Sequence, residues 1–316
     1  MKEKKTILFG PVRSRRLGRS LGIEMVPKKI CTMNCIYCEV GKTTILTTKR
    51  KEYYPWDLIE KSILQAKEIE DIFDVFTFTG SGEPTLNIHF EKAIKLAKKI
   101  IKKPITVLTN STLLHIPSVR KAMTEIDIVL PSLDAGREET LKKINRPHPK
   151  IELKNIIENL KKLRDEMKGE MWLEILFVEG INDSEEELNA LKSAIEYINP
   201  HKVQLNTVVR PSACKEAKPV SFEKLEKIAQ FFGDKAEIIV IKEKIDKVIK
   251  TFKILEEEKL KEEILNYIKR RPSTIEELSL AFKIEEKLIK SILNKFISEG
   301  VVKESLHEGK IFFLTP

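Results

Sequence analysis

Two kinds of apolar pattern alternate along residues 20–241. Short runs of nearly continuous apolar residues are typical of strands buried on both faces, and longer segments with an apolar residue every three or four positions are typical of helices that pack by one face. The strand pattern occurs at Ser20–Pro27, Phe73–Thr79, Ile105–Thr109, Ile126–Ser132, Trp172–Val178 and Val203–Val208, with a last run at Glu237–Ile241. The helical pattern occurs at Trp56–Ile69, Phe90–Lys102, Ile151–Met167, Ser184–Ile198 and Phe222–Phe232. The alternation predicts an α/β fold with a parallel sheet, in the form of an open or partial (β/α)6 TIM-like barrel whose functional groups lie at the carboxyl ends of the strands.

The last part of the chain follows a different pattern. Three helical segments precede a pattern of two short strands, and this order is typical of a winged-helix domain. The helices are predicted at Glu256–Arg270, Ile275–Phe282 and Glu285–Ser298, and the strands within Gly300–Leu314, with their turn near Glu308 and Gly309. We therefore expect two domains, residues 1–245 and residues 246–316, joined by a helix near Glu243–Lys253.

Charge is unevenly distributed along the 316 residues, whose formal net charge is +9. Residues 1–51 contain thirteen Lys and Arg against three Asp and Glu, whereas residues 255–316 contain eleven against twelve. An anionic partner is therefore expected to contact the N-terminal segment. No apolar stretch approaches the roughly 20 residues that a membrane span needs, and glycine, proline and arginine stand where a signal peptide would have its apolar core. These features predict a cytoplasmic protein without membrane contact.

Four arginines, Arg13, Arg15, Arg16 and Arg19, lie in a glycine-bounded segment before the first predicted strand. Two interpretations remain open. In the first, they bind an anionic partner such as the backbone of RNA or the acidic docking face of an electron donor. In the second, they pair with carboxylates of this chain and cap the barrel.

Cys31, Cys35 and Cys38 form a C-x3-C-x2-C loop directly after the first predicted strand. Thiolates are the usual ligands of iron–sulfur clusters, and a four-iron cluster held by three of them keeps one iron open for a chelating ligand. The alternative is a structural zinc site, which needs four ligands and would require the distant Cys214 to complete the set. The spacing and the ligand count favour the iron–sulfur cluster.

With Tyr37 before its last cysteine, the loop resembles the C-x3-C-x-aromatic-C signature of the radical S-adenosylmethionine (SAM) superfamily. The resemblance implies a catalytic [4Fe–4S] cluster on Cys31, Cys35 and Cys38, SAM at the open iron, and Tyr37 packed near the SAM adenine. It further implies an enzyme of the oxidoreductase or transferase type. In such enzymes an electron from a donor of the flavodoxin or ferredoxin type passes through the cluster and cleaves SAM, and the resulting 5′-deoxyadenosyl radical abstracts a hydrogen atom.

Further motifs at predicted strand ends resemble SAM-binding positions of the same superfamily. The segment Thr79–Pro84 resembles its GGEP motif, with Ser81 where glycine is more usual. For Glu174 the residues alone leave an alternative open, a salt bridge inside the barrel, because an unpaired buried carboxylate is costly. The resemblance implies cofactor binding by Gly80, Ser81, Gly82, Glu83, Asn110, Ser132, Asp134 and Glu174.

Two other segments, Phe9–Gly22 and Lys143–His148, resemble one branch of the superfamily, the iron–sulfur oxidoreductases related to tRNA wyosine-base (4-demethylwyosine) synthases. The chain lacks the cysteines that carry the second cluster of those synthases, since no cysteine precedes Cys31 and Cys214 alone follows Cys38. The relation and the basic segment together predict an RNA substrate such as tRNA. The competing hypothesis is a cluster-bearing regulator that binds DNA through its winged helix, which the near-zero charge of residues 255–316 disfavours.

Overall fold

The computed structural model describes residues 6–307 and 310–315. The chain divides into two units, Met1–Ile249 and Lys250–Pro316, and the division falls inside helix α8 (Lys242–Arg270). In the part of the chain that the structure describes, no helix is both long enough and apolar enough to cross a membrane.

The first unit is built on one eight-stranded sheet with the order β1-β2-β5-β6-β7-β8-β9-β10. Strand β1 is antiparallel to β2, and every other neighbouring pair in the sheet is parallel. The bounds are Leu8–Ser14, Gly18–Glu24, Val75–Thr79, Ile105–Thr109, Ile128–Pro131, Glu170–Phe177, Lys202–Thr207 and Ala236–Ile238. The predicted α/β fold with a mostly parallel sheet is therefore confirmed. The sheet is open, because the described residues of β1 and β10 do not pair.

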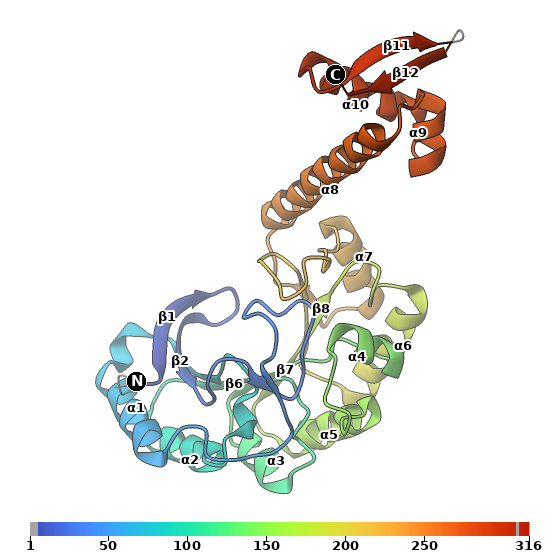
Figure 1. Cartoon of the computed structure of the whole chain (residues 1–316). Helices are drawn as coiled ribbons and strands as arrows, with labels where there is room; N and C mark the ends of the chain where they lie inside the picture. The colour runs from blue at the N-terminus through green and yellow to red at the C-terminus, as the bar shows by residue number, and fades with distance from the viewer. Residues whose placement is uncertain (1–5, 308–309, 316) are drawn as a thin grey trace. The chain divides into compact units, whose positions relative to one another are not determined.

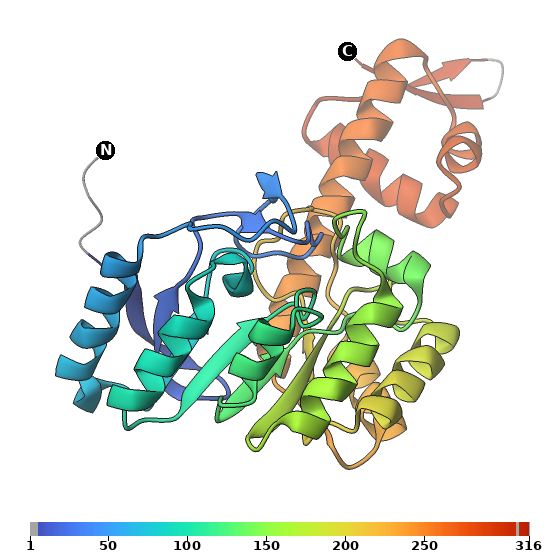
Figure 2. The same cartoon turned by 90° about the horizontal axis from the view of Figure 1, so that it is seen from below.

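Helices follow the strands and lie along the outer face of the curved sheet (Figures 1 and 2). Five of them were predicted: α1 (Trp56–Glu68), α2 (Phe90–Ile100), α5 (Leu153–Glu166), α6 (Glu185–Ile198) and α7 (Phe222–Phe232). Each buries an apolar stripe against the sheet, as α2 does with Phe90, Ala93, Ile94 and Ala97. The sequence patterns did not predict β1 or two seven-residue helices, α3 (Pro117–Met123) and α4 (Glu138–Ile144).

A hairpin formed by β1 and β2 connects the two ends of the sheet. The guanidinium of Arg16, at the hairpin turn, donates from Nη1 to Glu174 Oε2 on β8 at 2.6 Å and to Gln204 Oε1 on β9 at 3.1 Å. Asn206 Nδ2 donates to the other oxygen of Glu174 at 2.8 Å. Arg16 therefore holds the β1–β2 hairpin against β8 and β9, which are distant from it both in the sequence and in the order of the sheet.

Replacement of Arg16 with glutamine is expected to lower the free energy of unfolding by about 2–4 kcal/mol, since it leaves the poorly exposed Glu174 carboxylate without its cation. Arg19 supplies a matched control. Its ion pair with Asp74 at 2.8 Å has side chains 51% and 46% exposed, and such surface pairs contribute little to stability. Urea unfolding of Arg16→Gln and Arg19→Gln measures both effects, and equal losses would contradict the bridging role of Arg16.

The second unit has its own apolar core, formed by residues such as Ile264, Leu278, Ile292 and Phe296. The C-terminal part of α8 is followed by α9 (Ile275–Phe282), α10 (Glu286–Ser298) and an antiparallel pair of strands, β11 (Lys303–His307) and β12 (Lys310–Leu314). The predicted order of elements is confirmed, with α8 beginning earlier than the predicted helix. The predicted turn at Glu308 and Gly309 lies outside the described residues, and membership in the winged-helix class stays a prediction.

Candidate functional site

The three clustered cysteines lie beyond the carboxyl end of β2, on a loop that includes the short strand β3 (Ile30–Cys31). The loop packs on the turn that follows β5, where Lys29 N donates to Ser81 O at 2.9 Å and Glu83 N donates to Ile30 O at 3.2 Å. A Cβ atom on Gly82 would lie 1.8 Å from the Ile30 carbonyl oxygen, so only glycine permits this close approach. The turn after β5 therefore fixes the beginning of the cysteine loop.

Each of the three cysteine sulfurs receives a side-chain N–H donor from a different part of the chain. Lys29 Nζ lies 3.0 Å from Cys38 Sγ. Asn110 Nδ2, after β6, lies 3.5 Å from Cys31 Sγ, and Asn145 Nδ2, after α4, lies 3.4 Å from Cys35 Sγ. N–H donors directed at cluster sulfurs are a known means of stabilising and tuning an iron–sulfur centre.

The donor set fits the predicted four-iron cluster. A single metal ion needs ligands that converge on one point, and the described residues contain no group of three His, Cys, Asp or Glu placed in that way. In a four-iron cluster each thiolate binds its own iron, so the three sulfurs do not have to converge on one point. Burial raises the pKa of Cys31 to about 11 and raises the pKa of Cys35 further, so cluster binding must displace thiol protons.

A buried polar network lies beside the loop and includes two of the predicted site residues. The hydroxyl of Tyr37 donates to Asp134 Oδ2, which also accepts from Asn145 Nδ2 at 2.7 Å. The second oxygen of Asp134 accepts from Leu176 N at 2.9 Å, which ties the network to β8. The predicted SAM contacts of Tyr37 and Asp134 stay predictions, since in this structure the two side chains bind each other.

A small cavity of about 10 Å³ is lined by predicted site residues and by Asn145. The Oδ1 atom of Asn145 is buried and has no hydrogen-bond partner among the described residues, so it is available to accept from a bound water or cofactor. The four predicted residues on the wall are Tyr37, Asn110, Ser132 and Asp134.

The carboxyl group of Asp134 gives the unfolding free energy a defined pH dependence. Burial raises its pKa from 3.8 to about 6, against hydrogen bonds from Tyr37, Leu176 N and Asn145 that lower it. Between about pH 4 and 6 the folded state thus holds a proton that the unfolded state has released. The protonated carboxyl group of Asp134 therefore makes its full contribution to the free energy of unfolding below pH 4. This contribution, about 3 kcal/mol, is lost as the pH rises to about 6.

Urea unfolding of the metal-free protein at several pH values measures this decline. Asp134→Asn carries no titrating group there, so the difference in unfolding free energy between wild type and variant should change across pH 4–6. A difference that is constant with pH would contradict the raised pKa.

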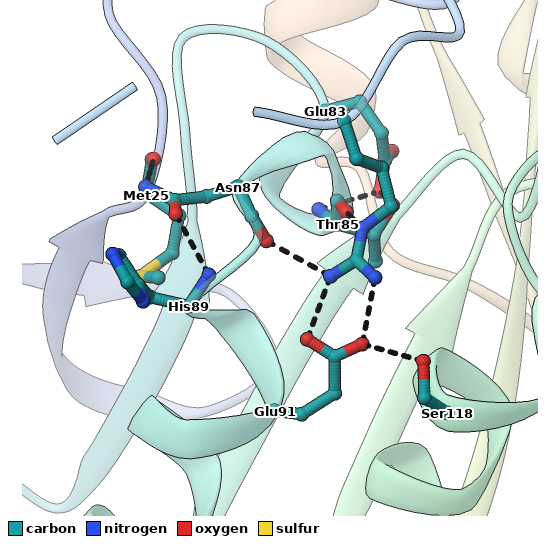
Figure 3. Close-up of polar contacts among 8 residues, drawn as sticks. Met25, Glu83, Thr85, Asn87, His89, Glu91 and Ser118 are labelled. Carbon is teal, nitrogen blue, oxygen red and sulfur yellow. Dashed lines mark hydrogen bonds and ion pairs between the residues drawn. The ribbon is translucent and has the colours of Figure 1, made fainter. Parts of the chain in front are cut away.

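Glu83 is a connecting residue within this site. Its side chain is 1% exposed and accepts from Thr85 N, Thr85 Oγ1, Thr109 Oγ1 and Asn110 N at 2.6–3.2 Å. Figure 3 shows its carboxylate turned toward Thr85 at the start of the short helix η2 (Pro84–Leu86). The carboxylate thus fixes the backbone of Asn110, and its predicted contact with SAM stays a prediction.

The other predicted site residues lie at strand ends or on strands of the same sheet. Ser81 Oγ donates to Glu24 Oε1 at the end of β2 at 2.6 Å, and Gly80 and Gly82 flank Ser81 in the turn. Glu174 forms the salt bridge with Arg16 that the residues alone had left open. Its predicted cofactor-lining role is not tested by this contact.

Several basic residues of the N-terminal segment are used within the chain. Arg16 and Arg19 form the ion pairs described above, and Arg50 makes a bidentate ion pair with Glu91. Glu91 also accepts from Ser118 Oγ (Figure 3). Arg15 has no ion-pair partner among the described residues, and burial lowers its pKa. Part of the basic segment therefore pairs with carboxylates of this chain, which is the second of the two interpretations given above.

Two residues that donate to the cysteines were missed by sequence reasoning. Lys29 was counted only as part of the basic segment, although it directly precedes the cysteine loop. Asn145 lies inside the segment Lys143–His148, whose motif was noticed without assigning a role to the asparagine. The position of Asn145 inside that motif was the one sequence signal that could have identified it.

Comparison with known proteins places these features in a family. The family model described as "Radical SAM superfamily" matches residues 25–191. A UPF0026 protein of Methanocaldococcus jannaschii, MJ1312, is 34% identical over 314 residues, which cover 98% of this chain and 96% of that protein. A UPF0026 protein of Helicobacter pylori is 36% identical over 73% of this chain and 75% of its own length.

Another relative is longer than this chain. The protein named GTPase Obg of Brachyspira hyodysenteriae is 35% identical over 97% of this chain, and the chain spans 45% of its length.

Solved structures agree in fold. A radical SAM methyltransferase from Sphaerobacter thermophilus has a TM-score of 0.50 at 16% identity, over 69% of this chain and 66% of that one. The FeFe-hydrogenase maturase HydG from Carboxydothermus hydrogenoformans has a TM-score of 0.51 at 16% identity, over 72% and 54% of the two chains.

Proposed function

Because this chain belongs to the radical SAM superfamily, whose cofactors are a [4Fe–4S] cluster and SAM, we propose that it is an enzyme that cleaves SAM reductively. The observation that carries the proposal is the set of three thiols on one loop, each with its own N–H donor, at the carboxyl end of a parallel sheet. When bound, cluster and SAM supply a one-electron cleavage that yields a 5′-deoxyadenosyl radical for hydrogen abstraction.

The chain's own residues would hold and orient these groups. Cys31, Cys35 and Cys38 would bind three irons, and the fourth would stay open to SAM. Gly82 brings the turn after β5 against the cysteine loop, and Glu83 fixes Asn110 beside Cys31. Tyr37 is oriented through its hydroxyl by Asp134. These contacts support a rigid cofactor site, which radical chemistry requires in order to restrict side reactions.

Anaerobic reconstitution with iron and sulfide, followed by reduction in the presence of SAM, tests the proposal. We expect 5′-deoxyadenosine to accumulate above the level of a reaction without reductant. A fully loaded cluster that neither yields this product nor changes its electron paramagnetic resonance (EPR) spectrum on SAM addition would contradict the function. In that case the cluster-bearing regulator becomes the better explanation.

For the substrate we propose an RNA such as tRNA, and for the electron source a donor of the flavodoxin or ferredoxin type. The support is the basic N-terminal segment, in which Arg13 and Arg15 have no ion-pair partner among the described residues. Phosphate contacts make binding salt-dependent. Binding of total tRNA that weakens steeply between 50 and 200 mM salt, and that weakens further in Arg15→Gln, is the expected result, and salt-insensitive binding would remove this support.

The second unit is proposed to present the substrate or to dock a protein, as a winged-helix domain of near-zero charge. The competing function is a regulator that binds duplex DNA through this unit, and the family match favours the enzyme over it. Duplex DNA that binds specifically and only in one cluster state, without SAM turnover, would reverse that preference.

A further inference from the structure

Lys29 is a buried cation directed at one of the cysteine sulfurs. Its side chain is 4% exposed, and its Nζ donates to Cys38 Sγ at 3.0 Å. Among the described residues, no carboxylate lies within ion-pair distance of this ammonium group. A buried ammonium without an opposite charge is costly, and a thiolate at Cys38 is the group placed to supply that charge.

The backbone of Lys29 is held on both sides. Its N–H donates to Ser81 O at 2.9 Å, in the turn after β5, and its carbonyl accepts from Thr44 N at 3.0 Å and Ile45 N at 3.2 Å, in the segment after the cysteines. The residue has a φ of 63°, in the left-handed region that a lysine rarely adopts. These hydrogen bonds hold the backbone of Lys29 in a conformation that residues other than glycine rarely adopt. From this backbone position the side chain reaches Cys38.

A cluster bound by thiolates would supply the missing negative charge. Hydrogen bonds to the sulfurs and nearby charge are the protein's main means of setting the reduction potential of an iron–sulfur cluster. Reduction adds one electron and therefore one negative charge, so a fixed ammonium beside a ligand sulfur stabilises the reduced state more than the oxidised state. Asn110 and Asn145 direct neutral amides at the other two sulfurs, and Lys29 alone among the three donors carries a full charge.

We propose that Lys29 raises the reduction potential of the cluster through a charge-assisted hydrogen bond to Cys38, so that a physiological donor can deliver the electron. This inference rests on the proposed function, because it needs the cluster on Cys31, Cys35 and Cys38. One electron passes from the external donor to the cluster, and no bond to Lys29 forms or breaks.

The test compares wild type with Lys29→Gln, Lys29→Arg and Lys28→Gln, each reconstituted anaerobically. Lys28 is the exposed neighbour of Lys29, so Lys28→Gln removes the same charge one residue away without touching the sulfur. Iron and sulfide are counted per chain, and the midpoint potential is measured by EPR-monitored titration with dithionite. We expect Lys29→Gln to decrease the reduction equilibrium constant at least about tenfold, which is a shift of about 59 mV to more negative potential. Lys29→Arg and Lys28→Gln should stay close to wild type.

The outcomes separate this inference from the proposed function. If wild type binds no cluster, both are wrong. If wild type binds a cluster but Lys29→Gln has the same potential as Lys28→Gln, or Lys29→Arg shifts as far as Lys29→Gln, the charge has no role and the inference alone is wrong. If Lys29→Gln remains folded by circular dichroism but holds less cluster, the potential of its loaded fraction decides. A value at least about 59 mV more negative than that of Lys28→Gln supports the inference, and an equal value contradicts it.

Discussion

Replacing Cys35 with alanine is expected to lower both cluster content and 5′-deoxyadenosine formation by at least about 100-fold. Cys35 is one of three thiols on a single loop, and its sulfur is held in place by Asn145. Two remaining cysteines cannot hold a site-differentiated four-iron cluster that needs three. Iron and sulfide analysis, with chromatography of the SAM reaction, measures both quantities on one sample.

Cys214→Ala is the matched control for this experiment. Cys214 is also a partly buried free thiol, and its backbone N–H donates to Ile36 O of the cysteine loop at 2.9 Å. Its removal tests whether any nearby thiol contributes to the cluster. Wild-type iron content and product in Cys214→Ala are expected. If Cys214→Ala lost the cluster as completely as Cys35→Ala, the three-cysteine assignment would have to be abandoned.

Glu83→Gln is expected to lower the free energy of unfolding by about 3–5 kcal/mol. The native carboxylate accepts four hydrogen bonds in a buried position, and an amide cannot accept from all four donors, because its nitrogen repels an N–H or O–H group. Since one of these donors is Asn110 N, the same change should displace the amide that approaches Cys31. We therefore expect cluster content to decrease together with stability.

The control for this prediction is Glu68→Gln, on an exposed position of α1, where loss of the charge should change stability by at most about 0.5 kcal/mol. Urea unfolding of both variants gives the comparison. Equal stability of Glu83→Gln and Glu68→Gln would show that the buried carboxylate does not connect the two strand-end turns.

The sheet and the candidate site differ in how far the sequence could predict them. Strand and helix positions follow from apolar spacing, and the carboxyl ends of parallel strands necessarily meet at one edge. The amino-acid pattern therefore predicted where the strand ends meet, and the resemblance to the radical SAM superfamily singled out the Gly80–Glu83 turn and Asn110 among the residues at those ends. The β1 strand was missed because most of its residues are exposed on an edge and show no apolar alternation.

The contacts inside the site could not be predicted from spacing. Asn145 reaches Cys35 across 110 residues, and Asn110 reaches Cys31 across 79. Which side chain points at which sulfur depends on how helices and loops pack, and neither periodicity nor motif carries that information. The arginines of the N-terminal segment could not be told apart from the sequence for the same reason. Arg16 and Arg19 lie in the same basic segment, but they differ in burial and in ion-pair partner.

The hairpin contact of Arg16 also has a consequence for protein synthesis. Its partners Glu174 and Gln204 follow it by 158 and 188 residues. At about 5–20 residues per second, roughly 10–40 s separate the translation of Arg16 from that of Gln204. The cysteines are made at the beginning of this interval, and the amides that approach two of them are made well within it. The cysteines and both amides are therefore made before the hairpin can complete its contact with β9.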